Sequence, residues 1–336
     1  MKKYVTLLVS ALLCSSVLIG CNNPKEPPIN STIESHTGNM TETLQANPKS
    51  DFEYQIREDG EFEITKYVGT DEHVIIPQSI DGKNVTVIGE RSFAGANILS
   101  LVMPDTVIYV FSHAFSGCEN LTDIKMSASL ITVSWGAFIN CNSLTCIDLS
   151  MESMKYIDED AFKNCQNLKT VKFGNNIQSI RKNAFYGCAS LEEVILPKNL
   201  QEIGEYAFGE CFGVKKVWIP KTLDKWGWYP FFKTTLVTEI VFEEGLKTIG
   251  SYGVFRGCQV EVLRIPASVE SIAMISFTAF PNLKEVYFEG AAPKVDEQSG
   301  IFDEAGQNVT VYYNPSMSGW DTTPLRDEYT LTPYEP

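Results

Sequence analysis

Residues 191–213 read LEEVILPKNLQEIGEYAFGECFG, and this stretch is the clearest copy of a unit that recurs along the chain. Its phenylalanine, Phe208, returns every 22 to 24 residues. A period this steady predicts one small supersecondary unit stacked many times, so the fold class follows before any single residue is interpreted. The recurring phenylalanines are Phe93, Phe115, Phe138, Phe162, Phe185, Phe208, Phe232, Phe255 and Phe277.

Each unit contains a short predicted strand. In the quoted copy Val194 and Leu196 are two residues apart, which places both on one face of a strand, and Pro197 ends the strand because proline cannot donate to the ladder. Ile203 precedes the Ala-Phe-x-x-Cys segment. We therefore predict a β-dominated α/β solenoid of about nine to ten repeats, each a short parallel strand plus a helical or 3₁₀ turn.

The motif Leu-x-x-Val-x-Ile-Pro, followed by Ile-Gly-x-x-Ala-Phe-x-x-Cys, resembles the BspA-type leucine-rich repeat of bacterial surface proteins. The resemblance runs roughly from Val74 to Phe288. It implies a leucine-rich repeat fold, and it implies binding because related proteins bind host matrix proteins or other cells. We accordingly assign residues 74–290 to the repeats, 51–73 to an N-terminal hairpin cap and 291–336 to a C-terminal strand and cap.

Two copies depart from the motif. The seventh reads WGWYPFF over residues 226–232, with Phe232 as the expected repeat phenylalanine and Thr235 in the cysteine position. The last has Phe280 in the cysteine position after Phe277. We expect the fold to tolerate both changes with altered local packing. Trp228 and Tyr229 are either a second adhesive feature or part of the local core.

The first 20 residues predict a lipoprotein signal peptide. Lys2 and Lys3 precede an apolar run that is too short to span a membrane comfortably. The run ends in Leu-Ile-Gly-Cys, which resembles a bacterial lipobox with Cys21 as the lipidated residue. Residues 21–50 are polar and predict a disordered, lipid-anchored tether. We expect an exported protein that is anchored to the bacterial membrane and displayed at the cell surface.

Both ends of the repeat array carry predicted strands. Alternating apolar residues at Phe52–Ile56 and at Phe62 and Ile64 flank a Glu-Asp-Gly turn, which predicts a hairpin over the first repeat. Val309-x-Val311 falls 23 residues after Val286-x-Phe288, so we expect a final strand there, after a loop over residues 293–307.

The net charge argues against a nucleic-acid partner, and the spacing of the cysteines argues against disulfides and a zinc site. With 42 acidic and 27 basic residues, the formal charge of −15 repels phosphate backbones, so no nucleic acid partner is expected. Six cysteines share one repeat position, and such a straight row is poorly placed for disulfides or for a tetrahedral zinc site. We expect an inward ladder of reduced thiols, with Cys146 on the outer strand face. The six are Cys118, Cys141, Cys165, Cys188, Cys211 and Cys258.

Nothing in the sequence points to catalysis, a cofactor or a metal ion. His36, His73 and His113 lie in separate segments without an obvious carboxylate or thiolate partner. The acidic run 158–160 is typical of a solvated turn. The best acid–base neighbours are Asp148, Lys172 and Lys125, and they make a poor catalytic cluster.

The candidate site is therefore a surface. The outward positions of the strands gather aromatic and aliphatic residues and an arginine in the second half of the chain, a composition typical of binding hot spots. Strands also carry such residues for their β-propensity alone. The predicted ligand-binding residues are Ile195, Lys216, Trp218, Glu239, Val241, Arg264 and Tyr287.

We interpret the chain as a non-catalytic, membrane-anchored cell-surface binding or adhesion module. Its ligand would be a protein, such as a host matrix protein, or a glycan. The first alternative is a polysaccharide-active enzyme on a parallel β-helix, which would need acids and bases clustered on adjacent turns. The second is a structural envelope protein whose strand face packs on copies of itself.

Overall fold

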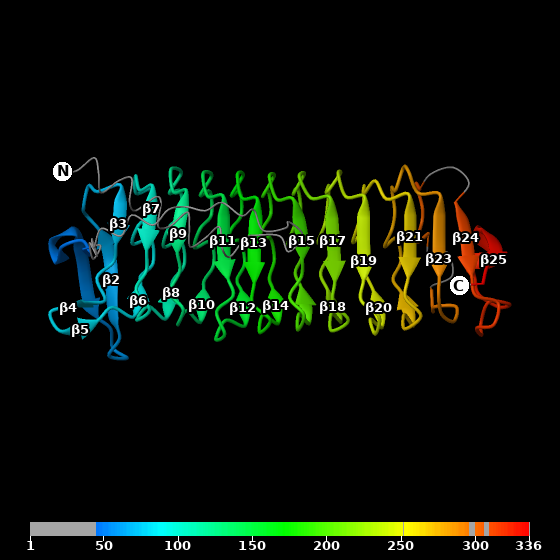
Figure 1. Ribbon diagram of the computed structural model, residues 1–336, viewed down its shortest axis with the longest axis horizontal. Coiled ribbons are helices and arrows are strands. Elements are labelled where there is room, and N and C mark those ends of the chain that lie inside the picture. The colour runs from blue at the N-terminus through cyan, green and yellow to red at the C-terminus, as the bar shows by residue number, and fades with distance from the viewer. Residues whose placement is uncertain (1–44, 251, 296–299, 306–308, 336) are drawn as a thin grey trace, which may run out of the picture.

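The computed structural model describes residues 45–250, 252–295, 300–305 and 309–335, which wind into an elongated solenoid of about 11 turns (Figure 1). The predicted signal peptide, Cys21 and residues 21–44 of the expected tether lie outside the described residues. The folded body begins before residue 51, because Asn47 is buried and its side-chain amide donates to Asp51 and Asp71. Among the residues described, no helix is long and apolar enough to cross a membrane.

The predicted strands form one long row of parallel strands along the body, which we call the strand row. They pair in short groups, β3-β7-β9, β11-β13, β15-β17-β19 and β21-β23-β24-β25. The strand row comprises β3 (His73–Ile75), β7 (Ser100–Val102), β9 (Asp123–Lys125), β11 (Cys146–Leu149), β13 (Thr170–Phe173), β15 (Glu193–Ile195), β17 (Lys216–Ile219), β19 (Glu239–Phe242), β21 (Val262–Ile265), β23 (Glu285–Phe288), β24 (Thr310–Tyr313) and β25 (Thr330–Pro333).

A second row of very short strands, which we did not predict, runs parallel to the first (Figure 1). It is built around the apolar residue that precedes each Ala-Phe segment, and its first eight strands, up to β18, form a nine-stranded sheet together with the N-terminal strand β1 (Phe52–Ile56). The row comprises β2 (Phe62–Tyr67), β6 (Val87–Ile88), β8 (Tyr109–Val110), β10 (Thr132–Val133), β12 (Tyr156–Ile157), β14 (Ser179–Ile180), β16 (Glu202–Ile203), β18 (Lys225–Trp226), β20 (Thr248–Ile249) and β22 (Ser271–Ile272). Beyond β18, β20 pairs only with β22.

The repeating phenylalanines form one continuous stack inside the solenoid. Neighbouring rings such as Phe138 and Phe162 lie 5.3 Å apart and within 2° of parallel. In the seventh turn the stacked ring is Phe231, 5.6 Å from Phe208, so the prediction of Phe232 was wrong. Pro230 and Phe231 bring the chain into the core one residue earlier than we expected, and Thr234, not Thr235, occupies the cysteine position.

The Ala-Phe-x-x-Cys segments are hydrogen-bonded turns, and the helical or 3₁₀ turn that we expected there was wrong. The backbone explains why. The residues two before and two after each phenylalanine have left-handed φ values, for example 54° at Asn183 and 75° at Gly187 around Phe185. A helix cannot continue through a residue with this conformation. Each phenylalanine N–H instead donates to the next turn, as Phe162 does to Ala184 at 2.8 Å.

The six ladder cysteines are buried, reduced thiols, as predicted. Each of the first five donates its S–H to the phenylalanine carbonyl of the preceding turn, for example Cys165 to Phe138 at 3.3 Å. Each of these carbonyls also accepts a backbone N–H within its own turn, as Phe138 does from Cys141 at 3.3 Å, so the thiol adds a second hydrogen bond that joins successive turns. In the seventh turn Thr234 occupies the cysteine position, but its hydroxyl donates within the same turn, to the Phe231 carbonyl at 2.8 Å.

These thiols make stability sensitive to alkaline pH. Burial raises the pKa of Cys118 and of Cys165 to about 12, against 9.0 for an unperturbed thiol. The folded chain keeps these protons where the unfolded chain loses them, so the stabilisation is complete below pH 9 and is lost as the pH rises toward 12. Urea unfolding at pH 8 to 11 should show a steadily falling free energy of unfolding. The fall should be shallower in a Cys118→Ala, Cys165→Ala double variant, and equal slopes would contradict the assignment.

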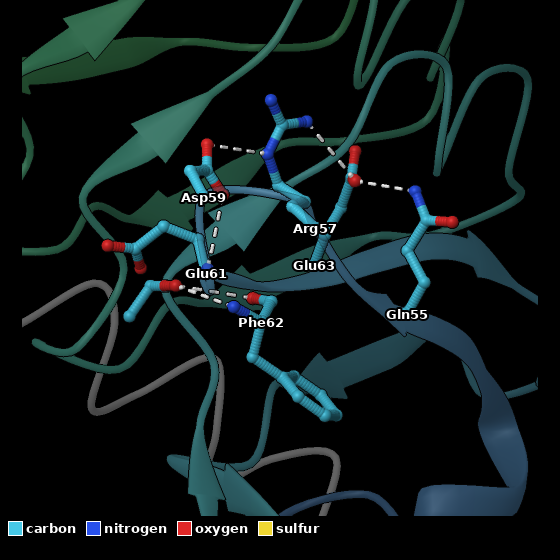
Figure 2. Close-up of polar contacts among 7 residues, drawn as sticks. Gln55, Arg57, Asp59, Glu61, Phe62 and Glu63 are labelled. Atoms are coloured by element: carbon cyan, nitrogen blue, oxygen red, sulfur yellow. Dashed lines mark hydrogen bonds and ion pairs between the residues drawn. The ribbon is translucent and has the colours of Figure 1, made fainter.

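The N-terminal hairpin expected at 51–73 corresponds to β1 (Phe52–Ile56), which pairs antiparallel with β2. A 3₁₀ turn, η1 (Lys49–Asp51), precedes β1, and a small antiparallel pair follows, β4 (Ser79–Ile80) with β5 (Lys83–Asn84). Figure 2 shows the polar contacts of the hairpin: Arg57 lies between Asp59 and the buried Glu63, and Gln55 donates to Glu63 at 2.8 Å.

The C-terminal cap continues the strand row. β24 is the final strand that we expected after the loop over residues 293–307, and it pairs with β23 in a register that opposes Val311 to Val286, two residues later than the 23-residue period alone would place it. The loop before β24 is longer than in the other turns, which shifts the register without changing the face that Val311 presents. The chain then packs Trp320 over Phe288 and ends in α2 (Leu325–Glu328) and β25.

Candidate binding surface

The outward side of the strand row, which we call the strand face, carries the predicted ligand-binding residues. Strand alternation places Val194, Val217 and Ile240 in the core and leaves their neighbours outside. β15, β17 and β19 are hydrogen-bonded in register, so that Ile195, Trp218 and Val241 lie directly beside one another. Ile195 is 52% exposed, and Trp218 and Val241 are half-buried. These three side chains form a continuous apolar strip across adjacent turns.

Charged residues border this strip. Glu193, Lys216 and Glu239 occupy the neighbouring register positions on the same three strands. The Lys216 ammonium lies 2.7 Å from the Glu239 carboxylate, and both side chains are exposed. An exposed pair of this kind contributes little to stability, because water screens it. Because both side chains are exposed, a ligand with its own charged or polar groups can bind to the carboxylate and the ammonium group in place of their mutual ion pair.

The other two predicted residues lie on the next two strands of the row, beyond a break in the hydrogen-bonded ladder. Arg264 lies on β21 and Tyr287 on β23, and these strands belong to a different hydrogen-bonded group from β19. The Arg264 guanidinium lies 4.4 Å from the centre of the Tyr287 ring. The candidate surface therefore has two parts, the apolar strip on β15–β19 and an aromatic cluster that begins at Arg264.

Sequence reasoning missed half of the aromatic cluster. Tyr312 on β24 pairs with Tyr287, and the two rings stack at 4.6 Å and 9°. Tyr334 meets both rings edge-on, at 5.2 Å from Tyr287 and 6.4 Å from Tyr312. Strand alternation around Val311 was the signal that could have revealed Tyr312. No local sequence pattern predicts that Tyr334 belongs to the cluster. The chain reaches it only after α2 and β25 of the C-terminal cap have folded back beside β24.

Carboxylates surround the aromatic cluster. The Tyr287 hydroxyl donates to Glu285 at 3.0 Å, and this hydrogen bond is the main reason that the pKa of Tyr287 is raised. Glu289 lies 3.7 Å from Arg264. The cluster thus offers π faces, one guanidinium and two carboxylates on a single surface, a combination able to bind both apolar and charged groups of a protein.

The best acid–base candidate is an ordinary ion pair. Asp148 on β11 pairs with Lys172 on β13 at 2.9 Å. Burial opposes ionisation of Asp148, but hydrogen bonds from Ser150 and Lys172 outweigh it and lower the pKa of the carboxyl group. An aspartate stabilised in its ionised, paired form is poorly suited to exchange protons near neutral pH.

The histidines and cysteines do not gather into a site within the described part of the chain. His73 contacts the Ser100 hydroxyl at 2.8 Å, and His113 packs edge-on against Trp135 at 4.6 Å. Cys146 is partly exposed on β11, on the outer face where we expected it. No group of three or more His, Cys, Asp or Glu residues is arranged to hold a metal ion among the residues described.

Comparison with known families agrees with the repeat architecture. The family model described as the BspA type leucine rich repeat region matches residues 86–215 and 201–299, with six copies. The matched segments make up more than half of the chain. The chain belongs to the BspA-type leucine-rich repeat family. No functionally curated protein is significantly similar to this BspA-type chain.

Several solved structures are similar to this BspA-type protein. A leucine rich cell surface protein from Faecalibacterium prausnitzii is 19% identical, with 84% of this chain and 98% of that chain covered and a TM-score of 0.40. A leucine-rich repeat protein from Bacteroides capillosus is 31% identical over 37% of this chain and 94% of that chain, with a TM-score of 0.33. The pneumococcal vaccine antigen PcpA is 18% identical, with coverages of 85% and 83% and a TM-score of 0.43.

The BspA-type motif fixes the inward residues of every turn and leaves the strand face to vary. The central outward positions hold Ile75 and Val102 on β3 and β7, the charged residues Lys125, Asp148 and Lys172 on the next three strands, and Ile195, Trp218 and Val241 on β15, β17 and β19. The strip on β15–β19 differs from the rest of the row because it places a large aromatic side chain between two aliphatic ones on adjacent, paired strands.

Proposed function

We propose that this protein is a non-catalytic binding or adhesion module of the bacterial cell surface, and that its strand face engages a protein ligand. The observation that carries the proposal is the strip of Ile195, Trp218 and Val241, three outward apolar side chains held in register on adjacent turns. A rigid, partly exposed tryptophan between two aliphatic side chains fits the usual composition of a binding hot spot.

The two parts of the surface suit an extended protein partner. The strip offers apolar contact, and the aromatic cluster around Tyr287 offers π faces with carboxylates at its border. Parallel turns repeat these groups at about 4.8 Å intervals along the axis, so one ligand can contact several turns at once. The solenoid needs no rearrangement to present them, which reduces the entropy cost of binding.

The membrane anchor and the surface location remain part of the proposal. The lipobox-like segment ending at Cys21 supports lipidation, and the occurrence of BspA-type repeats in bacterial surface proteins supports display outside the cell. The preferred partner is a protein such as one of the host matrix, with a glycan as the other ligand class, and no nucleic acid.

Binding of purified extracellular matrix proteins to the immobilised full chain, measured by surface plasmon resonance, tests the proposal. Trp218→Ala should weaken binding about 30-fold, because a central aromatic anchor contributes roughly 2 kcal/mol. Tyr287→Ala should also weaken it. Trp135→Ala is the matched control, since Trp135 is 49% exposed but lies outside the strand face. Equal affinities for the wild type and both strand-face variants would refute the role of this surface.

A further inference from the structure

A second exposed surface lies on the side of the solenoid formed by the Ala-Phe-x-x-Cys turns, which we call the turn edge. In the turns around Phe208, Phe231 and their neighbours, this edge carries six aromatic side chains within 70 residues of sequence. They are Tyr186, Tyr206, Trp228, Tyr229, Phe232 and Tyr252. We propose that this part of the turn edge, together with the groove beside it, binds a neutral oligosaccharide.

Most of these rings contact one another. Tyr206 and Tyr229 stack at 5.6 Å and 15°, Phe232 meets Tyr229 edge-on at 5.7 Å, and Tyr252 meets Tyr229 edge-on at 6.4 Å. A Cβ on Gly253 would lie 2.4 Å from Cε1 of Tyr229, so the tyrosine ring can occupy this position only because residue 253 has no side chain. The result is a fixed aromatic platform with Trp228 and Tyr252, 62% and 48% exposed, at its border.

The backbone under the platform adopts an unfavourable conformation for its residues. In other turns the left-handed position two before the phenylalanine holds residues that tolerate it, such as Gly136, Asp160 and Asn183, although it also holds Arg91 and Ile275. In the platform the same position holds Tyr206 and Tyr229, with φ values of 52° and 54°. Bulky side chains cost conformational free energy there. Neither ring belongs to the buried phenylalanine stack, and both lie partly exposed at the surface.

A groove of about 400 Å³ adjoins the platform. It crosses the ends of β14, β16 and β18, and its lining includes Glu205 and Gly227, which directly precede Tyr206 and Trp228 in the chain. Gly204 and Gly227 lie so close to the preceding turn that a Cβ on either would come within 2.4 Å of its backbone. These two glycines therefore let successive turns pack closely against each other along the floor of the groove.

The charges of the groove cancel. Three basic and three acidic side chains line it, and one of the pairs, Lys182 with Glu205, is joined at 2.8 Å. On the platform, Lys233 pairs with Glu210 at 2.9 Å. The lining charges are Arg181, Lys182, Lys225, Glu159, Glu202 and Glu205. A lining without excess charge but rich in donors and acceptors favours a ligand that is uncharged and polar.

The apolar part of the site is aromatic. Trp226 lines the groove, and its indole N–H, itself shielded, has no hydrogen-bond partner among the residues described. Sugar rings combine C–H faces, which pack on aromatic rings, with hydroxyls that hydrogen-bond to carboxylates, ammonium groups and tyrosine hydroxyls. A neutral oligosaccharide matches both halves of the site, whereas an anionic glycan would gain no net attraction from a lining whose charges cancel.

An array of immobilised oligosaccharides, neutral, sialylated and sulfated, probed with the full chain, tests the inference. We expect binding to at least one neutral oligosaccharide, weakened at least tenfold by Trp228→Ala and by Glu202→Gln. Both side chains are exposed, and thermal unfolding of each variant should match the wild type. Trp135→Ala is the matched control, because Trp135 stands at the same repeat position as Trp228, four turns earlier, and should leave binding unchanged.

Three outcomes would overturn the inference: no binding to any neutral oligosaccharide, a preference for the sialylated or sulfated forms, or undiminished binding by Trp228→Ala. Loss of a matrix protein ligand on Trp228→Ala, without glycan binding, would instead assign the platform to a protein partner and would also overturn it. Trp218→Ala separates the two surfaces, since it should weaken strand-face binding and leave oligosaccharide binding unchanged.

Discussion

Replacing Phe162 by alanine should lower the free energy of unfolding by about 3–5 kcal/mol, because it leaves a cavity at the centre of a closely packed stack. Phe162 is fully buried, with Phe138 and Phe185 each 5.3 Å away and nearly parallel. Guanidinium unfolding followed by circular dichroism measures the change. Neighbouring turns cannot close the gap, because backbone hydrogen bonds fix their spacing.

The matched control for this variant is Phe212→Ala. Phe212 is 42% exposed and lies outside the stack, so its removal should change stability by no more than about 0.5 kcal/mol. Because each turn contacts only its neighbours, hydrogen exchange in Phe162→Ala should accelerate most in the turns of Phe138, Phe162 and Phe185. Equal unfolding midpoints for the two variants would show that the stack does not hold the solenoid together.

Replacing Gly204 by alanine should destabilise the protein by about 1–3 kcal/mol through overpacking. The added Cβ would lie 2.4 Å from the backbone of Arg181 and Lys182 in the preceding turn, and backbone atoms cannot move aside as a flexible side chain can. Gly204 has no left-handed φ, so the cost comes from collision and not from torsional strain. Thermal unfolding should show the loss as a lower midpoint.

Gly174→Ala provides the comparison for Gly204→Ala. The nearest atoms to a Cβ on Gly174 are backbone atoms at 3.1 Å, so a small displacement accommodates it. We expect a smaller decrease in the unfolding midpoint than for Gly204→Ala. If Gly204→Ala is as stable as Gly174→Ala, adjacent turns at the groove have more freedom than this packing implies.

Much of the candidate surface could be predicted from the sequence. Successive side chains of a strand point to opposite faces, so the buried residues of a strand identify its outward ones. The buried Val194, Val217 and Ile240 in this way identified Ile195, Trp218 and Val241 as outward residues. The same rule applied to Val311 would have added Tyr312. Tyr334 and the break in the hydrogen-bonded ladder between β19 and β21 could not be predicted, since both depend on how distant segments meet.

The sequence by itself determined the repeat, its register and the inward rows of phenylalanine, cysteine and aliphatic residues, because the same interactions recur in every turn and the pattern is therefore redundant. Tertiary structure alone decided that Phe231 and not Phe232 enters the stack, since both are apolar and only the ring of the preceding turn distinguishes them. It also decided that two-residue strands form a second sheet and that the phenylalanine turns are left-handed at two positions. Hydrogen bonds between successive turns set both features, and no single turn contains their partners.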